Sequence, residues 1–320
     1  MMLARLLKDL LSGGGTPAAV DCRGKLTVGM AAYGNARVTA HALQCLFCAL
    51  RGDFELILVD DNSPDNTLEL FRSAVAIHRN TQLFHFPENK EYSGSLNAVL
   101  SHATRESVLF LSNDVFVTPG YFAGLAGVSS LDGDYGIVRG VSNFCDDQLP
   151  VHNLPTPLSC GRDVKSLFRF AAEIARRHAD GVALDSFLTG DAFLVRRPLL
   201  DKIGTIDTSL FGYFADIDFG VRARIAGFKQ VTALGAFAYH SQDANFRYLD
   251  PAAHEAKRER RVGRVHGAWG RFCTKYAAAI PEGSRFSKVG DLPWDSLSDT
   301  EFIAAKHYVA PLDYSALRVR

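Results

Sequence analysis

The stretch FELILVDDNSPDNT, residues 54–67, decides the fold class of this chain. Its first half is an almost continuous apolar run, which is typical of a strand buried on both faces. It ends in two acidic residues and a turn-forming Asn-Ser-Pro. A helical pattern then opens at Pro64, with Ser63 as the expected N-cap. A buried strand that leads into a helix is the repeating unit of a parallel, helix-covered sheet.

The same order of strand and helix extends in both directions from this stretch. The apolar runs predict strands near 26–32, 54–60, 82–86 and 107–112. The patterns between and after them predict helices near 36–50, 64–79 and 94–104. We therefore expect an α/β fold whose mostly parallel central sheet is flanked by helices.

The chain changes character after residue 114. A polar stretch at 142–160 contains three prolines and predicts a long loop. Beyond it, the apolar and helical periodicities predict helices near 163–178, 198–203 and 216–226, and strands at 187–197 and 231–240.

Three parts are expected along the chain. Residues 1–24 form an N-terminal helical appendage, because five leucines share one helical face before Ser-Gly-Gly-Gly ends the pattern. Residues 25–245 form the main domain, in two halves at 25–115 and 116–245. Residues 246–320 form a helical C-terminal extension.

Composition narrows the range of functions. The chain has 320 residues, 47% of them hydrophobic, and 35 basic residues balance 35 acidic ones, so its formal net charge is zero. This balance argues against nucleic acid as a partner. No apolar run reaches the roughly 18 residues that span a bilayer, and charges interrupt the N-terminus. We therefore expect no signal peptide and a cytoplasmic location.

Six cysteines in a chain of this length are not a disulfide scaffold. Cys45 and Cys48 form a lone C-x-x-C inside an apolar helical pattern. This setting is more typical of buried thiols than of a metal or redox pair.

Polar residues stand where the predicted strands end. In an open parallel sheet, ligands bind in the crevice beyond these carboxyl ends. A carboxylate there can bind a divalent ion that phosphate oxygens complete, or accept hydrogen bonds from a nucleobase or ribose, although turns and helix caps use the same residue types. The cleft suits a metal-bound phosphorylated ligand. Its expected residues are Tyr33, Asp60, Asp61, Asn89, Asn113 and Asp114.

Three later residues extend this set. Asp216 and Asp218 lie at a predicted helix start, where the helix dipole also favours acidic residues. His240 ends an apolar strand, and a lone histidine is more often structural than a ligand.

Five segments together resemble the inverting glycosyltransferases of family 2, which have a GT-A-type, Rossmann-like fold. They cover about residues 25–241, and the last resembles especially members that transfer rhamnose and related sugars in surface-polysaccharide assembly. The segments are LTVGMAAYGN, FELILVDDNSPDNT, FHFPENKEYSGSLNAVL, SVLFLSNDVFVTPGYF and the stretch from FLTGDAF to GAFAYH at 187–240.

The resemblance implies a role for each part of the cleft. The half at 25–115 would bind the nucleotide and the half at 116–245 the acceptor. Asp216 falls on the general base, and Asp114 falls on a ligand position for Mn²⁺ or Mg²⁺. His240 falls where many members place a further ligand to the metal or to the diphosphate. The expected donor-nucleotide residues are Ala31, Tyr33, Asp60, Asp61, Asn89 and Asn113. The expected acceptor residues are Gly190, Asp191, Tyr213 and Asp218.

Three positions depart from the family pattern, and they keep rival functions open. Ala31-Ala32 replaces Pro-Thr, the metal element Ser-Asn-Asp has a single acid, and Ala215 replaces the Glu before the base. One rival is a catalytically impaired homologue that only binds nucleotide sugars. Another is a nucleotidyltransferase, although AAYGNARV is a poor match to the Gly-rich, basic loop that such enzymes need.

The basic stretch near 255–276 carries an apolar stripe that includes Trp269 and Phe272. We expect the stripe to pack on the body of the protein. The alternative roles are contact with a membrane surface or an acidic acceptor, or a homo-oligomer through the terminal helices. The expected partners are a UDP-, dTDP- or GDP-linked sugar donor and a glycan, lipid-linked or protein acceptor.

Overall fold

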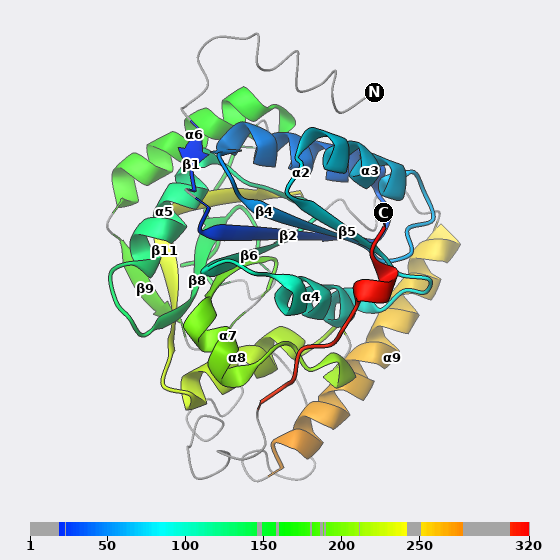
Figure 1. Ribbon diagram of the computed structural model, residues 1–320. Coiled ribbons are helices and arrows are strands. Elements are labelled where there is room, and N and C mark those ends of the chain that lie inside the picture. Colours follow the sequence, from blue (N-terminus) through cyan, green and yellow to red (C-terminus); the bar gives the residue numbers. More distant parts are fainter. Residues whose placement is uncertain are drawn as a thin grey trace.

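A mostly parallel sheet lies between two groups of helices in the computed structural model (Figure 1). The structure describes residues 19–22, 24–145, 149–157, 160–179, 181–185, 188, 190–210, 212–241, 251–277 and 308–319, with side chains from 263 onward in the last helix. Most of the expected appendage therefore lies outside the described residues.

The strands of the main sheet follow the order β5-β4-β2-β6-β10-β8-β11-β7, and β9 pairs with β11. The first four run parallel: β5 (Thr81–His85), β4 (Glu55–Asp60), β2 (Leu26–Ala32) and β6 (Ser107–Ser112). β10 (Ala192–Arg196) is antiparallel to both β6 and β8 (Tyr135–Ser142). β11 (Lys229–His240) is parallel to β8 and antiparallel to β7 (Val115–Phe116) and β9 (Val182–Asp185).

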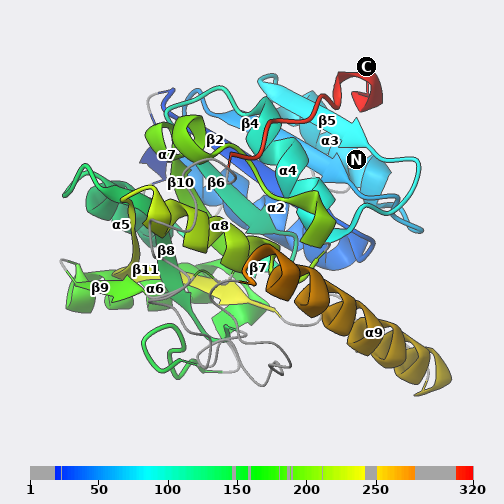
Figure 2. The same ribbon diagram turned by 90° about the horizontal axis from the view of Figure 1, so that it is seen from below.

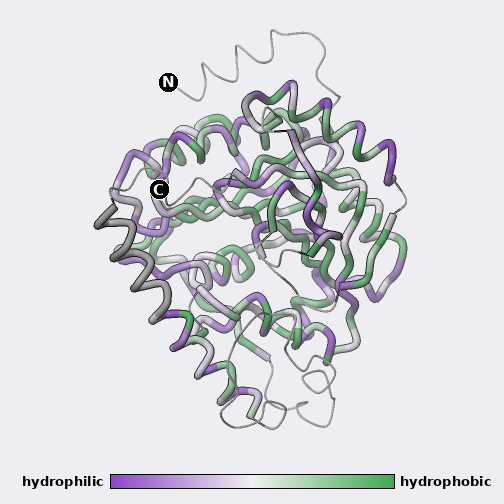
Figure 3. Tube along the Cα trace, turned by 180° about the vertical axis from the view of Figure 1, so that it is seen from behind, coloured by the Kyte–Doolittle hydropathy of each residue, from purple (hydrophilic) through white to green (hydrophobic). Residues whose placement is uncertain are grey.

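Helices cover both faces of the sheet, and each group buries its own hydrophobic cluster against it. One face carries α2 (Ala36–Ala49), α3 (Thr67–Ile77), α5 (Pro119–Ser129) and α6 (Val164–His178). The other carries α4 (Glu91–His102), α7 (Arg197–Ile203), α8 (Ala215–Ile225) and α9 (Pro251–Lys275). Figure 3 shows hydrophobic stretches running through the strands and the helices beside them.

The predicted α/β fold is confirmed, and its strands begin and end within a few residues of their expected positions. One local prediction is wrong. Helix α3 begins at Thr67 after Asn66, so Ser63 is not its N-cap. Instead, the Ser63 hydroxyl accepts a hydrogen bond from the Gly34 amide at 2.8 Å and ties the loops after β2 and β4 together. Helix α5 and strand β8 were not predicted.

The two ends of the described chain attach to the body by short extended contacts. β1 (Val20–Asp21) pairs with β3 (Leu50–Arg51) in a separate two-stranded sheet. Residues 308–319, here called the C-terminal strap, are extended apart from a short 3-10 turn at Ser315–Leu317. Within the range expected to be a helical extension, the described residues thus form the helix Pro251–Lys275 and this mostly extended strap.

Two predictions from composition can be compared with the described residues. Cys45 is buried, Cys48 is partly buried, and both are free thiols whose pKa is raised by burial. No helix among the described residues has the length and apolar character needed to cross a membrane.

Candidate active site

The polar residues expected at the strand ends do meet at one edge of the sheet. The register sets Ala32 opposite Asp60, and Ala31 opposite Ser112, so β2, β4 and β6 end at the same level. His240 ends β11 and lies beside β7, which follows Asp114 directly. The carboxyl ends of strands from both halves of the main domain thus form one site.

The two neighbouring acids after β4 have different surroundings. Asp60 is fully buried, and its Oδ2 lies 2.7 Å from Nδ1 of His85. Asp61 is nearly buried and accepts a hydrogen bond from the Lys90 amide at 2.6 Å. Burial raises the pKa of Asp61 to about 7, against the backbone amides of Lys90 and Glu91, which lower it. The burial of Asp60 does not fit the expected contact with a nucleotide.

The surface above Asp61 is formed by an aromatic ring and an amide. The Tyr33 side chain is 50% exposed, and Ala31 lies partly buried below it on β2. Asn89 is exposed, and its Nδ2 donates to the Asp61 carbonyl at 3.4 Å. An open ring beside hydrogen-bonding groups can bind a planar base and its ribose.

Asn113 holds the turn after β2 and the first turn of α2 by two side-chain hydrogen bonds. Its Nδ2 donates to the Gly34 carbonyl at 3.2 Å and to the Thr39 hydroxyl at 2.8 Å. Because Gly34 follows Tyr33, the Asn113 amide holds the turn that presents the tyrosine ring. The structure therefore gives Asn113 a supporting place beside the expected nucleotide pocket.

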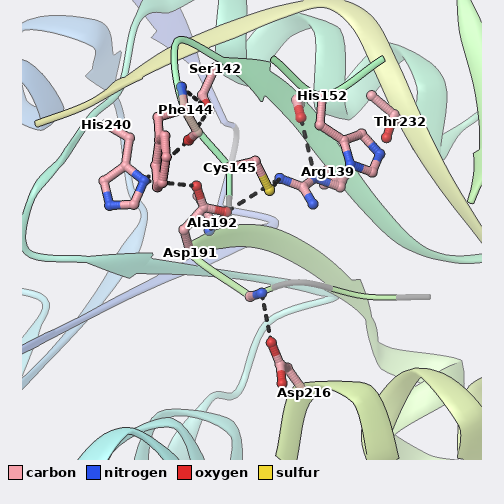
Figure 4. Close-up of polar contacts among 12 residues, drawn as sticks. Arg139, Ser142, Phe144, Cys145, His152, Asp191, Ala192, Asp216, Thr232 and His240 are labelled. Atoms are coloured by element: carbon pink, nitrogen blue, oxygen red, sulfur yellow. Dashed lines mark hydrogen bonds and ion pairs between the residues drawn. The ribbon is translucent and has the colours of Figure 1, made fainter. Parts of the chain in front are cut away.

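Asp114, His240 and Asp191 form a charged corner of the site. His240 lies between the two acids, with Nε2 3.3 Å from Asp114 Oδ2. Its Nδ1 lies 3.4 Å from Asp191 Oδ2 (Figure 4). Behind them, the buried guanidinium of Arg139 places Nη2 3.4 Å from the other oxygen of Asp191 (Figure 4). The four side chains alternate in charge.

The alternating charges shift the pKa values of His240 and Asp191. Burial alone would lower the pKa of His240, but hydrogen bonds to Asp114 and Asp191 raise it to about 11. Burial would raise the pKa of Asp191, but His240 and Arg139 hold it below its ordinary value. His240 is therefore an imidazolium at neutral pH, paired with two carboxylates.

The corner fits a divalent cation that takes most of its ligands from elsewhere. In the part of the chain that the structure describes, no three His, Cys, Asp or Glu side chains are arranged to hold an ion alone. Asp114 and His240 still offer an oxygen and a nitrogen donor, which Mn²⁺ accepts in mixed sites. The imidazolium already places positive charge between the two carboxylates, and an ion binding there would release its proton.

Asp216 lies in the first turn of α8 and is held by backbone amides. Its Oδ2 accepts a hydrogen bond from the Gly190 amide, and its Oδ1 accepts one from the Ile217 amide, both at 2.9 Å. The Tyr92 hydroxyl donates to the Gly190 carbonyl, so residue 190 is held through both its amide and its carbonyl. A Cβ at residue 190 would lie 2.2 Å from the Tyr92 oxygen, which explains the glycine.

Asp218 does not fit the expected contact with an acceptor. Its carboxylate is fully buried, 2.8 Å from Arg222 Nε and 2.6 Å from Lys275 Nζ. Tyr213 is partly buried beside the aromatic cluster of α9, and Ala215 is fully buried. Of the four expected acceptor residues, Gly190 contacts Asp216 and Asp191 belongs to the charged corner.

The site contains three side chains that sequence reasoning missed. Arg139 supports Asp191, Tyr92 holds Gly190, and Glu91 pairs with Arg264 of α9. Only Arg139 leaves a signal, since it is a charged residue within the otherwise apolar run YGIVRGV. A charge in a buried strand needs a partner and so points to one.

Comparison with known proteins identifies the family of the chain. The family model described as "Glycosyltransferase like family 2" matches residues 24–263, and the chain belongs to this family. The uncharacterized protein y4gI of Sinorhizobium fredii (strain NBRC 101917 / NGR234) is 24% identical over 223 residues, or 68% of this chain. The chain spans 24% of the length of that curated relative.

Solved structures show the same GT-A-like fold. The mannosyltransferase PcManGT from Pyrobaculum calidifontis, in complex with GDP-Man and Mn²⁺, has a TM-score of 0.54 at 20% identity and covers 95% of this chain and 77% of its own. GalNAc-T7 with UDP, GalNAc and Mn²⁺ has a TM-score of 0.52 at 12% identity, over 68% of this chain and 44% of its own. At these identities the likeness is one of fold.

Proposed function

We propose that this family 2 member transfers a hexosyl or deoxyhexosyl group, such as rhamnose, from a nucleoside diphosphate to an acceptor hydroxyl with inversion. One observation carries the proposal: a single short segment, Gly190–Asp191, contacts both the proposed base and the charged corner. The Gly190 amide donates to Asp216 at 2.9 Å, and the Asp191 carboxylate lies 3.4 Å from His240. Acid–base and phosphate-binding groups are therefore adjacent.

The reaction we propose is a single displacement at the anomeric carbon. The acceptor oxygen attacks as its proton passes to Asp216, while the bond from the anomeric carbon to the diphosphate oxygen breaks on the opposite face. Both oxygens of Asp216 accept backbone hydrogen bonds, which orient the carboxylate and leave lone pairs for the incoming proton. The nucleoside diphosphate leaves with the electron pair.

The charged corner would hold the leaving group in this reaction. Asp114 and His240 would hold Mn²⁺ or Mg²⁺, and a bound divalent ion neutralises negative charge that develops on a diphosphate. Asp191, anchored by Arg139, keeps His240 in place. On the other side, Tyr33, Asp61 and Asn89 would bind the base and ribose, which aligns the anomeric carbon with the acceptor.

The solved relatives support this reading of the donor. GDP-Man with Mn²⁺ and UDP with Mn²⁺ are the ligands bound in two proteins of the same fold. We propose a UDP-, dTDP- or GDP-linked donor, and a glycan, lipid-linked or protein acceptor in the cytoplasm.

A thermal-shift panel tests the proposal. UDP-, dTDP- and GDP-sugars are added with Mn²⁺ or with EDTA, and we expect one base to raise the Tm only when Mn²⁺ is present. Asp114→Ala should abolish that Mn²⁺ dependence, while Asp134→Ala, whose side chain is 65% exposed on the surface, should not. A metal-stimulated shift that persists in Asp114→Ala would refute the metal assignment, and donor binding without transfer would favour a binding homologue.

A further inference from the structure

We propose that α9 is a brace of the active site, with Arg264 positioning the loop of the nucleotide pocket and Lys275 and Tyr276 positioning the helix that carries Asp216. The proposal rests on the function proposed above. Figure 1 shows α9 at the side of the molecule, and Figure 2 shows that its last turns lie against the body while its first turns extend away from it.

The first grip is an ion pair at the nucleotide pocket. Arg264 Nη1 lies 2.9 Å from Glu91 Oε1, and the Glu91 side chain is mostly buried. Glu91 directly follows Lys90, whose amide binds the Asp61 carboxylate. The cation on α9 therefore holds the residue next to the main contact of Asp61.

The second grip is a buried charge cluster at the start of α8. Lys275 Nζ lies 2.6 Å from Asp218 Oδ1 and 2.7 Å from Asp207 Oδ2. The Tyr276 hydroxyl donates to the same Asp218 oxygen at 2.8 Å. Asp218 is two residues after Asp216, in the same helical turn. Contacts that hold Asp218 therefore also fix the backbone that carries Asp216.

Backbone conformation shows that two residues in contact with α9 are strained. In the described part of the chain, four non-glycine residues have a positive φ, and two of these are asparagines. The others are Glu91, with φ of 61°, and Phe214, with φ of 64°, which caps α8. A left-handed conformation costs such residues roughly 1–3 kcal/mol, so it persists only where neighbours hold it.

Both of these strained residues are held by α9. Arg264 holds Glu91, and the Phe214 ring packs 5.5 Å from Trp269 and 5.4 Å from Phe272, measured between ring centroids. Arg264 and Lys275 are eleven residues apart on the helix, which is about 16 Å at 1.5 Å per residue. One rigid helix therefore fixes the loop of the proposed nucleotide pocket relative to Asp216, the proposed general base.

Charge reversal tests the first grip. Arg264→Glu should weaken binding of UDP or GDP with Mn²⁺ about two- to tenfold, because it sets two carboxylates against each other at a partly exposed pair. The double variant Arg264→Glu with Glu91→Arg should restore affinity to within about twofold. The matched control is the double variant Lys25→Glu with Glu106→Lys, which reverses an exposed ion pair at the opposite ends of the strands. It should leave the affinity for UDP or GDP with Mn²⁺ unchanged.

Loss of one hydroxyl tests the second grip. Tyr276→Phe should lower kcat about five- to tenfold, because it removes a hydrogen bond to a buried carboxylate, while nucleotide affinity stays unchanged. Hydrogen exchange should quicken at 212–218 in Tyr276→Phe and at 88–92 in Arg264→Glu. This exchange measurement needs no substrate, so it tests the brace even if the wild-type protein transfers no sugar.

The results separate the brace from simple packing. A lower Tm in each variant with unchanged exchange, affinity and kcat would overturn the proposal. Failure of the double reversal to restore affinity would overturn the Arg264 grip. Wild-type protein that binds neither UDP nor GDP would instead refute the proposed function, and the exchange data would still decide the brace.

Discussion

At the scale of single residues, two carboxylates in the same helical turn have opposite environments. Asp216 is partly exposed and accepts hydrogen bonds from backbone amides, whereas Asp218 is fully buried against Arg222 and Lys275. A buried carboxylate in a paired cluster stabilises the fold, because removing its charge leaves buried cations without compensation. Only the accessible carboxylate can take a proton from an acceptor.

We predict that Asp216→Asn lowers kcat by about 10²- to 10⁴-fold, because it removes the proposed general base without changing the shape of the side chain. Nucleotide affinity and Tm should remain near the wild-type values. The control is Asp218→Asn, which should lower the free energy of unfolding by about 3–5 kcal/mol, measured by urea denaturation. If Asp218→Asn alone abolished turnover in folded protein, the two roles would be exchanged.

We predict that Asp61 makes stability depend on pH. Its pKa is raised from 3.8 to about 7, so the folded state keeps a proton that the unfolded chain has lost. This component of stability is therefore greatest at low pH and is lost as pH rises from about 4 to about 7.

Urea denaturation of wild type and Asp61→Asn at several pH values measures this component. The difference between the two proteins should change by up to about 4 kcal/mol between pH 4 and pH 8, in favour of the variant at high pH. Parallel stability curves for the two proteins would contradict the raised pKa.

At the scale of elements, close packing of α4 on β2 aligns the strand ends with the helix that begins at Glu91. The approach depends on Gly29, where a Cβ would lie 2.1 Å from Cγ1 of the fully buried Val99. A larger residue there would push α4 and its first turn away from the sheet. The loop of the proposed nucleotide pocket precedes that turn, so the packing at Gly29 also affects the position of this loop.

We predict that Gly29→Ala lowers the free energy of unfolding by about 1–3 kcal/mol through overpacking. Adding Val99→Ala should recover part of the loss, because it removes the methyl groups that clash. The control is Gly127→Ala in α5, where a Cβ meets nothing within 4 Å; it should be neutral or stabilise by up to about 1 kcal/mol. Calorimetry or urea denaturation would show the contrast, and an unaffected Gly29→Ala would mean that α4 can move.

At the scale of the whole molecule, the C-terminal strap connects the loop after α7 with strand β5. The Thr205 amide donates to the Val309 carbonyl at 2.8 Å, and the Val319 amide donates to the Leu83 carbonyl at 2.7 Å. Between these contacts the Tyr314 ring stacks on Phe86 at 5.5 Å. The strap therefore runs from the loop after α7 to edge strand β5 and covers that edge in part.

We predict that Tyr314→Ala lowers the free energy of unfolding by about 1–3 kcal/mol, because a half-buried ring leaves its contacts. Tyr308→Ala, at a side chain 59% exposed, should stay within about 0.5 kcal/mol of wild type. Faster hydrogen exchange in β5 should accompany the loss at Tyr314. Equal stability of both variants would show that the strap does not hold the edge.

Local sequence determined the alternation of strand and helix, and with it the placing of Asp61 and Asp114 at strand ends. These features depend on apolar runs and turn residues that are neighbours in the chain. Only the tertiary structure decided that Asp191 and Arg139 support His240, that Asp60 and Asp218 are buried, and that the strap covers β5. The contacts of Asp191 and of the strap join residues about 50 to more than 200 positions apart, where no local periodicity operates, so these partners follow from the tertiary packing.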